Sequence, residues 1–513
     1  MPLLLILLTI AACLPTSRFA PPAGFTRLDS AVATLVTVAL PVLLTALAGR
    51  WVERTLAADP AARPRVARRY GRARRRLPLL TLAAAALSVV GWGWSDTVAR
   101  TAVVSYGGQW LLAPFAELLM PLPYFVALAC NWVSHHAAER ALHATSDRAR
   151  RDPDDDPAAA EFWSLGGYVG FQARQLALGL GLAVGVCAVN LTLARFAPES
   201  MALPAVQVAG LAIAVLAFAG FPRLVPGLLG LQPLPPGPAR DRLHATAARL
   251  RVRFTRILLW PTRGLMVNAL VLGVVPQARY VIFTDRLLGA LNPAELDAVL
   301  GHEAGHVRHG HLWLYLAFLV LSSAFLAALG AAAEQAFAAR HWSLPAEYDW
   351  ALGVLPLAAM GLWLFVVFGW LSRACERQAD VFGARAGSCA DPYCLGHDAT
   401  TPLVERGRGL CRTGAANMMA ALDRVGESAG LDRPGRGPRA SLRRRAQSWL
   451  RAWQHGPMSH RIEFLMRLAD DPALGDRSDR AALLAKAGLM AALAAGLGGL
   501  SLVVDWAEIA RGM

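Results

Sequence analysis

Charged residues are scarce in this sequence of 513 residues, at 17% against the roughly one quarter that soluble domains carry. Cysteine is scarce as well, because seven residues in so long a chain are too few for a secreted fold held together by disulfides. Acidic residues number 36 against 51 lysines and arginines, whereas the hydrophobic share reaches 55%. This composition excludes a disordered chain, a collagen-like repeat and a small secreted scaffold, and it is typical of a membrane protein.

Long apolar runs predict eight membrane-spanning helices. A hydrocarbon core about 30 Å thick requires roughly 20 apolar residues in a helix. The predicted spans are Ala31–Leu47, Leu77–Trp94, Trp110–Val133, Leu176–Phe196, Leu203–Phe221, Leu312–Ala333, Trp350–Leu371 and Ala485–Val504. A shorter apolar run within residues 1–15 can be a further span, a signal segment or, at Cys13, a lipidation site, so the total is eight or nine.

The distribution of arginine predicts the orientation of these spans. The loop Arg50–Arg76 is rich in arginine, whereas Ser95–Tyr106 contains only Arg100. Because Lys and Arg near the ends of spans stay in the cytoplasm, the first loop is expected inside. By alternation, the other inside loops are Asn131–Gln172, Pro222–His311 and Ser372–Asp479. We expect a multi-pass protein of the bacterial inner membrane that contacts lipid and binds no nucleic acid, since the Arg-rich loop lacks Gly-rich turns that would cradle phosphates.

A helix with a metal-binding motif is predicted directly before the sixth span. Asn292 can cap its start and Pro293 suits its first position. His302 and His306 are four residues apart, so both imidazoles project from one helical face and can bind one zinc ion. Glu303 lies beside them and can take a proton from a water activated by the metal without being a ligand itself.

A third protein ligand is expected, because a catalytic zinc ion usually has three. Two predicted spans separate His306 from Glu376, and an even number of crossings returns Glu376 to the side of the histidines. Asp380 follows one helical turn later and can accept a hydrogen bond from a ligating imidazole. His309 and His311 can be extra ligands, but we interpret them as residues of the membrane interface.

These motifs resemble a known family. The stretch HEAGHVRHGH, followed after a membrane hairpin by ERQADVFGA, is similar to the membrane-integrated HExxH zinc metallopeptidases that include the HtpX heat-shock protease and the CAAX prenyl endopeptidase. The resemblance covers Val267–Leu465. It implies a mainly α, polytopic membrane protein with a gluzincin-like peptidase domain that contains a small β-sheet, and one catalytic Zn²⁺. The site residues implied are the ligands His302, His306 and Glu376, the base Glu303, the supporting Asp380, and substrate or transition-state contacts from His455 and Arg461.

The resemblance also implies how a substrate binds. Family members have an edge strand before the zinc helix, and residues 280–284 are similar to it. We expect this strand to bind an extended peptide by adding it to the sheet edge. Its residues are Tyr280, Val281, Ile282, Phe283 and Thr284. Asn268, with Ala269, is expected near the substrate cleft. One position departs from the family, since Gly456 follows His455 where the family has proline.

The sequence predicts three parts, and the second contains an unusual insertion. Residues 1–221 form an N-terminal multi-span domain, residues 222–480 the peptidase domain, and residues 481–513 a C-terminal transmembrane helix. A membrane hairpin at 312–371 and a cysteine-containing insertion at 386–413 interrupt the peptidase domain. The insertion holds Cys389, Cys394, His397 and Cys411. These are the residue types of a structural zinc site, but their irregular spacing leaves free thiols, a second metal and a disulfide all open.

The predicted function is an integral-membrane zinc endopeptidase that hydrolyses peptide bonds of protein or peptide substrates at the cytoplasmic membrane face. The alternative is a membrane signal transducer whose zinc protease domain cleaves one dedicated regulator. A transporter or scaffold with a vestigial site is disfavoured, because the predicted ligands and Glu303 are all present. The sequence specifies neither the substrate nor the oligomeric state.

Overall fold

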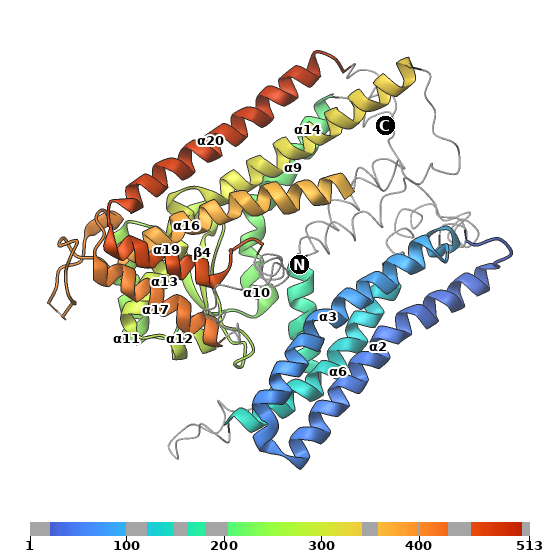
Figure 1. The fold of residues 1–513 in the computed structure, drawn as a ribbon, viewed down its shortest axis with the longest axis horizontal. Coiled ribbons are helices and arrows are strands. Elements are labelled where there is room, and N and C mark those ends of the chain that lie inside the picture. The colour runs from blue at the N-terminus through green and yellow to red at the C-terminus, as the bar shows by residue number, and fades with distance from the viewer. Residues whose placement is uncertain are drawn as a thin grey trace, which may run out of the picture. The chain divides into compact units, whose positions relative to one another are not determined.

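The structure is a computed structural model and describes residues 21–98, 121–147, 162–179, 204–340, 358–398, 400–428 and 453–504. The chain divides into two compact units. The first is made mainly of residues 1–210 with 344–357, and the second of residues 211–343 with 358–512. Both units are predominantly helical (Figure 1).

The first unit is built on three long helices. They are α2 (Arg27–Ala58), α3 (Arg63–Val90) and α6 (Leu122–Asp147), with the short 3₁₀ helix η1 (Pro60–Ala62) between the first two. Helix α2 starts at a capping box, in which the Thr26 hydroxyl accepts a hydrogen bond from the Asp29 amide and the Asp29 carboxylate accepts one from the Thr26 amide. An ion pair of 2.7 Å between Arg74 Nε and Glu139 Oε1 joins α3 to α6.

The chain from Pro204 onward holds a small sheet and the remaining helices. Before and within the sheet region lie α9 (Pro204–Gly220), η4 (Phe221–Arg223), α10 (Val225–Leu229), β1 (Gln232–Pro233), α11 (Pro238–Leu250), β2 (Arg256–Trp260), β3 (Ala269–Leu272), η5 (Pro276–Ala278) and β4 (Tyr280–Thr284). After it come α12 (Asp285–Ala290), α13 (Pro293–Arg308), α14 (His311–Ala339), the π-helix η7 (Leu364–Phe368), α16 (Gly369–Ala386), η8 (Glu405–Gly407), α17 (Arg412–Ser428), α19 (Met458–Asp470) and α20 (Leu474–Ser501).

The four strands form one sheet in the order β1-β2-β4-β3. Strands β2 and β4 run parallel, and the other two pairs are antiparallel. One core cluster packs the sheet against α11, α12 and α13, with Leu243, Phe283 and Leu300 almost fully buried. This core fixes α13 beside the sheet.

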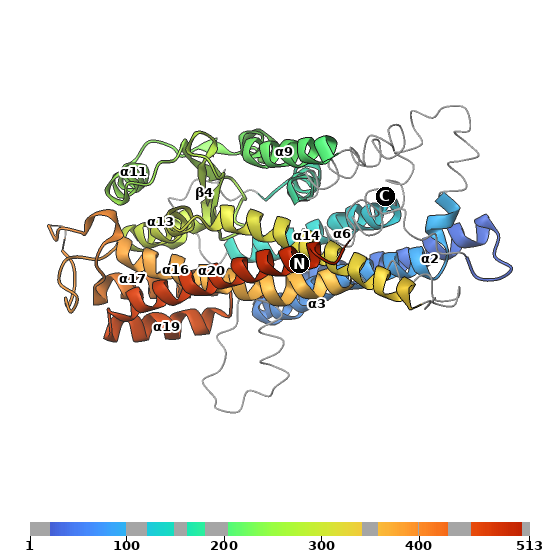
Figure 2. The ribbon, with the colours of Figure 1, turned by 90° about the horizontal axis from the view of Figure 1, so that it is seen from above.

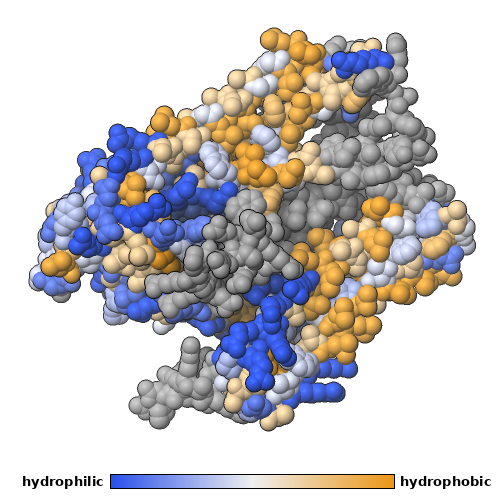
Figure 3. Space-filling model, viewed as in Figure 1, coloured by the Kyte–Doolittle hydropathy of each residue, from blue (hydrophilic) through white to orange (hydrophobic). Residues whose placement is uncertain are grey.

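Four described helices are long and apolar enough to cross a membrane. They are α2, residues 311–337 of α14, residues 358–386 leading through α16, and α20. Three predicted spans fall on α2, α14 and α20, and Trp350–Leu371 falls in part on the helix that starts at residue 358. Parts of Trp110–Val133, Leu176–Phe196 and Trp350–Leu371 lie outside the described residues. Helices α14, α16 and α20 run alongside one another, as Figure 2 shows. Apolar side chains cover the exposed faces of α14, α20 and α2 (Figure 3). The mainly α, polytopic fold with a small sheet is thus confirmed, and the number of spans stays a prediction.

Candidate active site

Helix α13 begins where the sequence predicts. The Asn292 side chain accepts a hydrogen bond of 2.9 Å from the Glu295 amide, and the Glu295 carboxylate accepts one of 2.9 Å from the Asn292 amide. Pro293 occupies the first helical position. This reciprocal cap fixes the start of the helix, and the residues from Glu295 to Gly305 are buried.

Glycines in α13 allow α16 to approach closely. A Cβ atom on Gly301 would lie 2.3 Å from Ala386 Cβ, and one on Gly305 would lie 2.9 Å from Ala379 Cα. Each of these glycines directly precedes a histidine of the motif. At both glycines the backbone of α13 therefore lies in direct contact with α16. This contact places His302 and His306 close to Glu376 and Asp380, which α16 carries.

Three side chains converge on one point between these helices. His302 Nε2 and His306 Nε2 are 3.3 Å apart, and the two oxygens of Glu376 lie 3.7 Å from His302 Nε2 and 3.6 Å from His306 Nε2. Ligand atoms at about 2.0–2.2 Å from one tetrahedral metal ion lie roughly 3.3–3.6 Å apart. The buried Glu376 Oε2 accepts no hydrogen bond within the described part of the chain. This set of ligand atoms fits a single metal ion.

The protonation of the histidines suits metal binding. Burial lowers the pKa of His306 to about 3, so its imidazole is neutral, which is the form that binds metals. Burial also lowers the pKa of His302, but the Asp380 and Glu376 carboxylates outweigh that effect and raise it in the absence of an ion. A cation at this position would take over the role of that proton as the positive partner of both carboxylates.

Asp380 contacts the ring nitrogen of His302 that faces away from the other two ligands. Its Oδ1 atom lies 3.0 Å from His302 Nδ1, and its side chain is completely buried. Arg461 from α19 binds both oxygens of Asp380, with Nε at 2.8 Å and Nη2 at 2.5 Å. Its Nη1 atom is also 3.3 Å from Glu376 Oε2. Arg461 therefore holds two carboxylates of α16 in place.

His455 reaches the same group from the segment before α19. Its Nδ1 atom donates a hydrogen bond of 2.9 Å to Glu376 Oε1, while 68% of its side chain is exposed. The next residue, Gly456, adopts a φ of +74°, which proline cannot reach because its ring fixes φ near about −65°. His455, Arg461 and Glu376 line a cavity of about 520 Å³. The departure from the family sequence thus coincides with a backbone turn that only glycine makes without strain.

Glu303 faces the sheet beside the three ligands. Its Oε2 atom accepts a hydrogen bond of 2.8 Å from the Val271 amide of β3. Burial raises the pKa of the Glu303 carboxyl to about 7, against the smaller opposing effects of His302 and the Val271 amide. Near neutral pH this carboxyl can therefore both accept and donate a proton.

The expected edge position of residues 280–284 is wrong. Strand β4 pairs with β2 on one side and with β3 on the other, so it has no free edge. The side chains of Val281, Ile282 and Phe283 are buried, in the sheet and its core. The sequence pattern identified a strand correctly, but the apolar character of these residues reflects an interior strand.

Among the described strands, β3 is the edge strand on the side of α13. Asn268 and Thr284 exchange main-chain and hydroxyl hydrogen bonds, so Asn268 faces β4. By the alternation of an antiparallel pair, the main-chain groups of Ala269 and Val271 face away from β4. The Val271 amide confirms this direction for its own position, because it points to Glu303.

His311 has a role in the site that the sequence analysis missed. Gly310, with a φ of +64°, turns the chain sharply between α13 and α14. His311 Nδ1 then lies 2.9 Å from His306 Nδ1, and His311 Nε2 lies 3.3 Å from Gln378 Oε1. Lys486 of α20 contacts the same Gln378 oxygen. A polar chain thus supports His306, and the only sequence signal was the density of histidines after the motif.

Comparisons with known proteins found a matching family and a similar fold. Residues 248–402 match peptidase family M48. The crystal structure of S. mikatae Ste24p has a similar fold, at 13% sequence identity and a TM-score of 0.50, over 87% of this chain and 100% of that chain. No curated protein matches. The predicted resemblance is confirmed over residues 248–402, which match peptidase family M48, and the comparisons support a metalloendopeptidase in a membrane.

Proposed function

We propose that this protein is a zinc endopeptidase that hydrolyses peptide bonds of protein or peptide substrates at the cytoplasmic face of a membrane. The observation that carries the proposal is the convergence of His302, His306 and Glu376, whose ligand atoms lie 3.3–3.7 Å from one another, beside the carboxyl group of Glu303. Two histidines and one glutamate form a known ligand set of catalytic zinc, which leaves a position for water or substrate.

Each group of residues at the site has a separate role in the proposed hydrolysis. Zn²⁺ held by the three ligands would polarise the scissile carbonyl and lower the pKa of the attacking water. Glu303 takes a proton from that water at a carboxylate oxygen and later gives it to the leaving amine. Burial raises the pKa of this carboxyl in the metal-free protein, which favours its acceptance of the proton. His455, with its exposed imidazole at the cavity, donates a hydrogen bond to the developing oxyanion.

We place the substrate along β3 instead of β4. The main-chain groups of Ala269 and Val271 face away from β4, so an extended peptide can pair with Ala269 and with the Val271 carbonyl as an added strand, while the Val271 amide stays bound to Glu303. Because the Val271 amide contacts Glu303, a peptide on this edge would run past the general base. Recognition through main-chain groups accepts many sequences, which suits an enzyme that cleaves varied proteins.

The cytoplasmic orientation rests on the arginine-rich loops. Arg69 in α3 and Arg308 at the end of α13 are both exposed and precede predicted spans. Single cysteines placed at Arg69 and Arg308 should react with a membrane-impermeant thiol reagent only after the inner membrane is opened. Labelling of the Arg308 position in intact cells would place the active site on the opposite face.

The variant Glu303→Gln tests the mechanism. It keeps the size of the side chain but removes the base, so zinc content should persist while kcat falls on the order of 10²- to 10⁴-fold. Glu405→Gln, which changes an exposed carboxylate in η8, serves as the matched control and should retain full activity. Cleavage by Glu303→Gln at a rate close to that of the wild type would rule out Glu303 as the base.

A further inference from the structure

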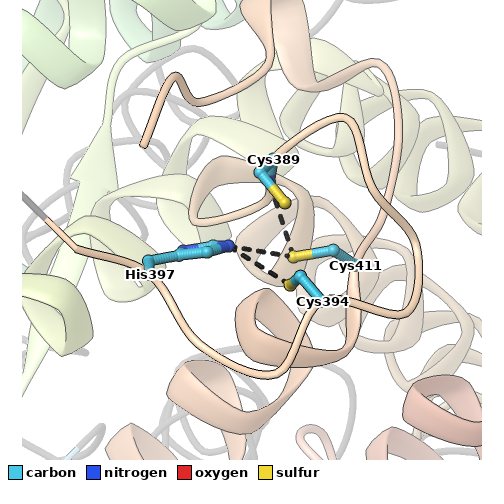
Figure 4. A group of neighbouring side chains, drawn as sticks. All are labelled: Cys389, Cys394, His397 and Cys411. Atoms are coloured by element: carbon cyan, nitrogen blue, oxygen red, sulfur yellow. Dashed lines mark hydrogen bonds between the residues drawn. The ribbon is translucent and has the colours of Figure 1, made fainter. Parts of the chain in front are cut away.

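A second group of metal-binding side chains lies outside the active site, in the segment between α16 and α17. The sulfur atoms of Cys389, Cys394 and Cys411 and a nitrogen of His397 all lie within 4.8 Å of one another. They point toward a common centre in Figure 4. His397 Nε2 is 3.4 Å from Cys394 Sγ and 3.4 Å from Cys411 Sγ.

These separations match those in a tetrahedral zinc site. With Zn–S distances of about 2.3 Å and Zn–N distances of about 2.0–2.1 Å, tetrahedral geometry places nitrogen and sulfur roughly 3.5 Å apart. Disulfides require sulfur atoms at about 2.0 Å, and all three cysteines are free thiols in the structure. The arrangement therefore fits a shared ion and not a bridge between two sulfurs.

The segment that carries these side chains has little else to fold it. Leu395 is 95% exposed and Tyr393 is 59% exposed, and among the described large apolar residues of the segment, Leu410 alone is buried in a core. Its described regular structure is limited to the three-residue η8 and an isolated bridge between Cys389 and Leu403. Irregular segments of this length are uncommon inside compact domains unless a function or another constraint holds them. A bound metal supplies such a constraint.

Hydrogen-bond donors surround two of the three sulfur atoms, those of Cys394 and Cys411. Cys411 Sγ accepts hydrogen bonds from the Cys389 amide at 3.4 Å and from the Gly414 amide at 3.3 Å. The Thr413 hydroxyl lies 3.1 Å from Cys394 Sγ. Hydrogen-bond donors of this kind orient metal-bound ligands and stabilise their negative charge.

We propose that Cys389, Cys394, His397 and Cys411 form a structural zinc site, separate from the catalytic ion. Four protein ligands complete a tetrahedral shell and leave no position for substrate, which distinguishes a structural site from a catalytic one. Three sulfurs and one imidazole nitrogen are soft ligands that suit zinc better than magnesium, calcium or manganese.

The position of this site links it to the helix that carries Glu376. Cys389 follows the end of α16 and Cys411 directly precedes α17, so one ion ties the two helix ends together. The helices meet closely there, because a Cβ atom on Gly414 would lie 2.4 Å from the Ala384 carbonyl oxygen. The structural zinc thus fixes the far end of the helix that supplies a catalytic ligand.

Metal analysis of the purified full-length protein tests the proposal. We expect about two zinc ions per chain, with X-ray absorption showing Zn–S contacts near about 2.3 Å. The active site contains no sulfur ligand, so this signal reports only on the insertion. The double variant Cys394→Ser, Cys411→Ser should lose one zinc and the Zn–S signal, whereas the exposed Cys130→Ser in α6 should keep both.

The outcomes separate this proposal from the proposed function. His302→Ala should lose the other zinc and keep the Zn–S signal, so failure at one site is visible independently of the other. A wild-type protein without Zn–S contacts would overturn the structural site, whatever the folding of the variants. Thiols that react fully without added chelator, or that titrate only after reduction, would also overturn it by indicating free cysteines or a disulfide.

Discussion

His302 Nδ1 lies 3.0 Å from Asp380 Oδ1, while Nε2 of the same ring faces His306 and Glu376. The carboxylate on one side of the imidazole therefore fixes the direction of the nitrogen on the other side. Asp380 is held in turn by Arg461, so the orientation of His302 depends on a buried ion pair. The orientation of His302 in α13 thus depends on Asp380 in α16, and the position of Asp380 depends on Arg461 in α19.

Replacing Asp380 should weaken the metal site without removing a ligand. Asp380→Asn keeps the shape of the side chain but loses the charge that orients His302, and such changes typically cost 10- to 100-fold in metal affinity. Competition with a zinc chelator measures this loss. Asp470→Asn, at the exposed end of α19, is the control and should have no effect. Equal zinc affinities in the two variants would contradict a supporting role for Asp380.

The close crossing of α13 and α16 predicts a second effect. In Gly305→Ala the added Cβ atom would lie 2.9 Å from Ala379 Cα, so the helices must separate and carry Glu376 away from the histidines. We expect a lower thermal midpoint and a lower zinc content. Gly289→Ala in α12 is the matched control, because its Cβ atom meets nothing within 4 Å. If both variants bind zinc equally, the close helix approach is not needed for the site.

Local patterns in the sequence were sufficient for part of this site. The cap at Asn292 and the pairing of His302 with His306 depend only on residues within a few turns of one helix, so spacing alone predicts them. Glu376 was found by counting membrane crossings and by resemblance. These predictions needed no knowledge of how distant segments pack.

The interior position of β4 and the contact between His311 and His306 depend on packing that local sequence patterns do not predict. The composition of β4 predicts a strand but does not distinguish an edge strand from an interior one. Its pairing with β2 and β3 shows that it is interior. His311 reaches His306 because Gly310 turns the chain, and its other partner, Gln378, lies on α16. Both features arise from contacts between segments far apart in sequence, or from one turn whose direction the sequence does not specify.

The contact between His311 and His306 can be tested by substitution. His311→Ala removes the group 2.9 Å from His306 Nδ1, so His306 loses its orienting partner. Zinc affinity should fall roughly 10-fold or more. His244→Ala, which changes an exposed histidine of α11, is the control. A larger loss in the control than in His311→Ala would show that the contact does not support the site.

Substrate recognition along β3 predicts a specific effect of proline. Ala269→Pro removes a main-chain N–H that faces away from β4, so an added peptide strand loses one hydrogen bond. A hydrogen bond contributes about 0.5–1.5 kcal/mol, which corresponds to a decrease of roughly 2- to 10-fold in kcat/KM. Ala269→Ser keeps the N–H and should cleave normally. Unchanged kcat/KM in Ala269→Pro, with zinc still bound, would place the substrate elsewhere.

The buried carboxyl of Glu303 predicts how the metal-free protein responds to pH. Burial raises the pKa of this group to about 7 from its ordinary value of 4.5, so between these values the folded protein keeps a proton that the unfolded chain has released. Stability contributed by the protonated carboxyl is therefore complete below pH 4.5 and is lost as pH rises toward about 7. At about 1.4 kcal/mol per pH unit, the total change is about 3 kcal/mol.

Thermal midpoints of the chelator-treated protein in detergent, measured against Glu303→Gln, isolate this effect because the glutamine does not titrate. The midpoint of the wild type relative to the variant should fall as pH rises from about 4.5 to about 7 and stay level above that range. Zinc at saturating concentration should reduce this pH dependence, since a nearby cation favours the charged carboxylate. Parallel pH profiles for the two metal-free proteins would mean that Glu303 has an ordinary pKa, and the case for its double role as base and acid near neutral pH would be lost.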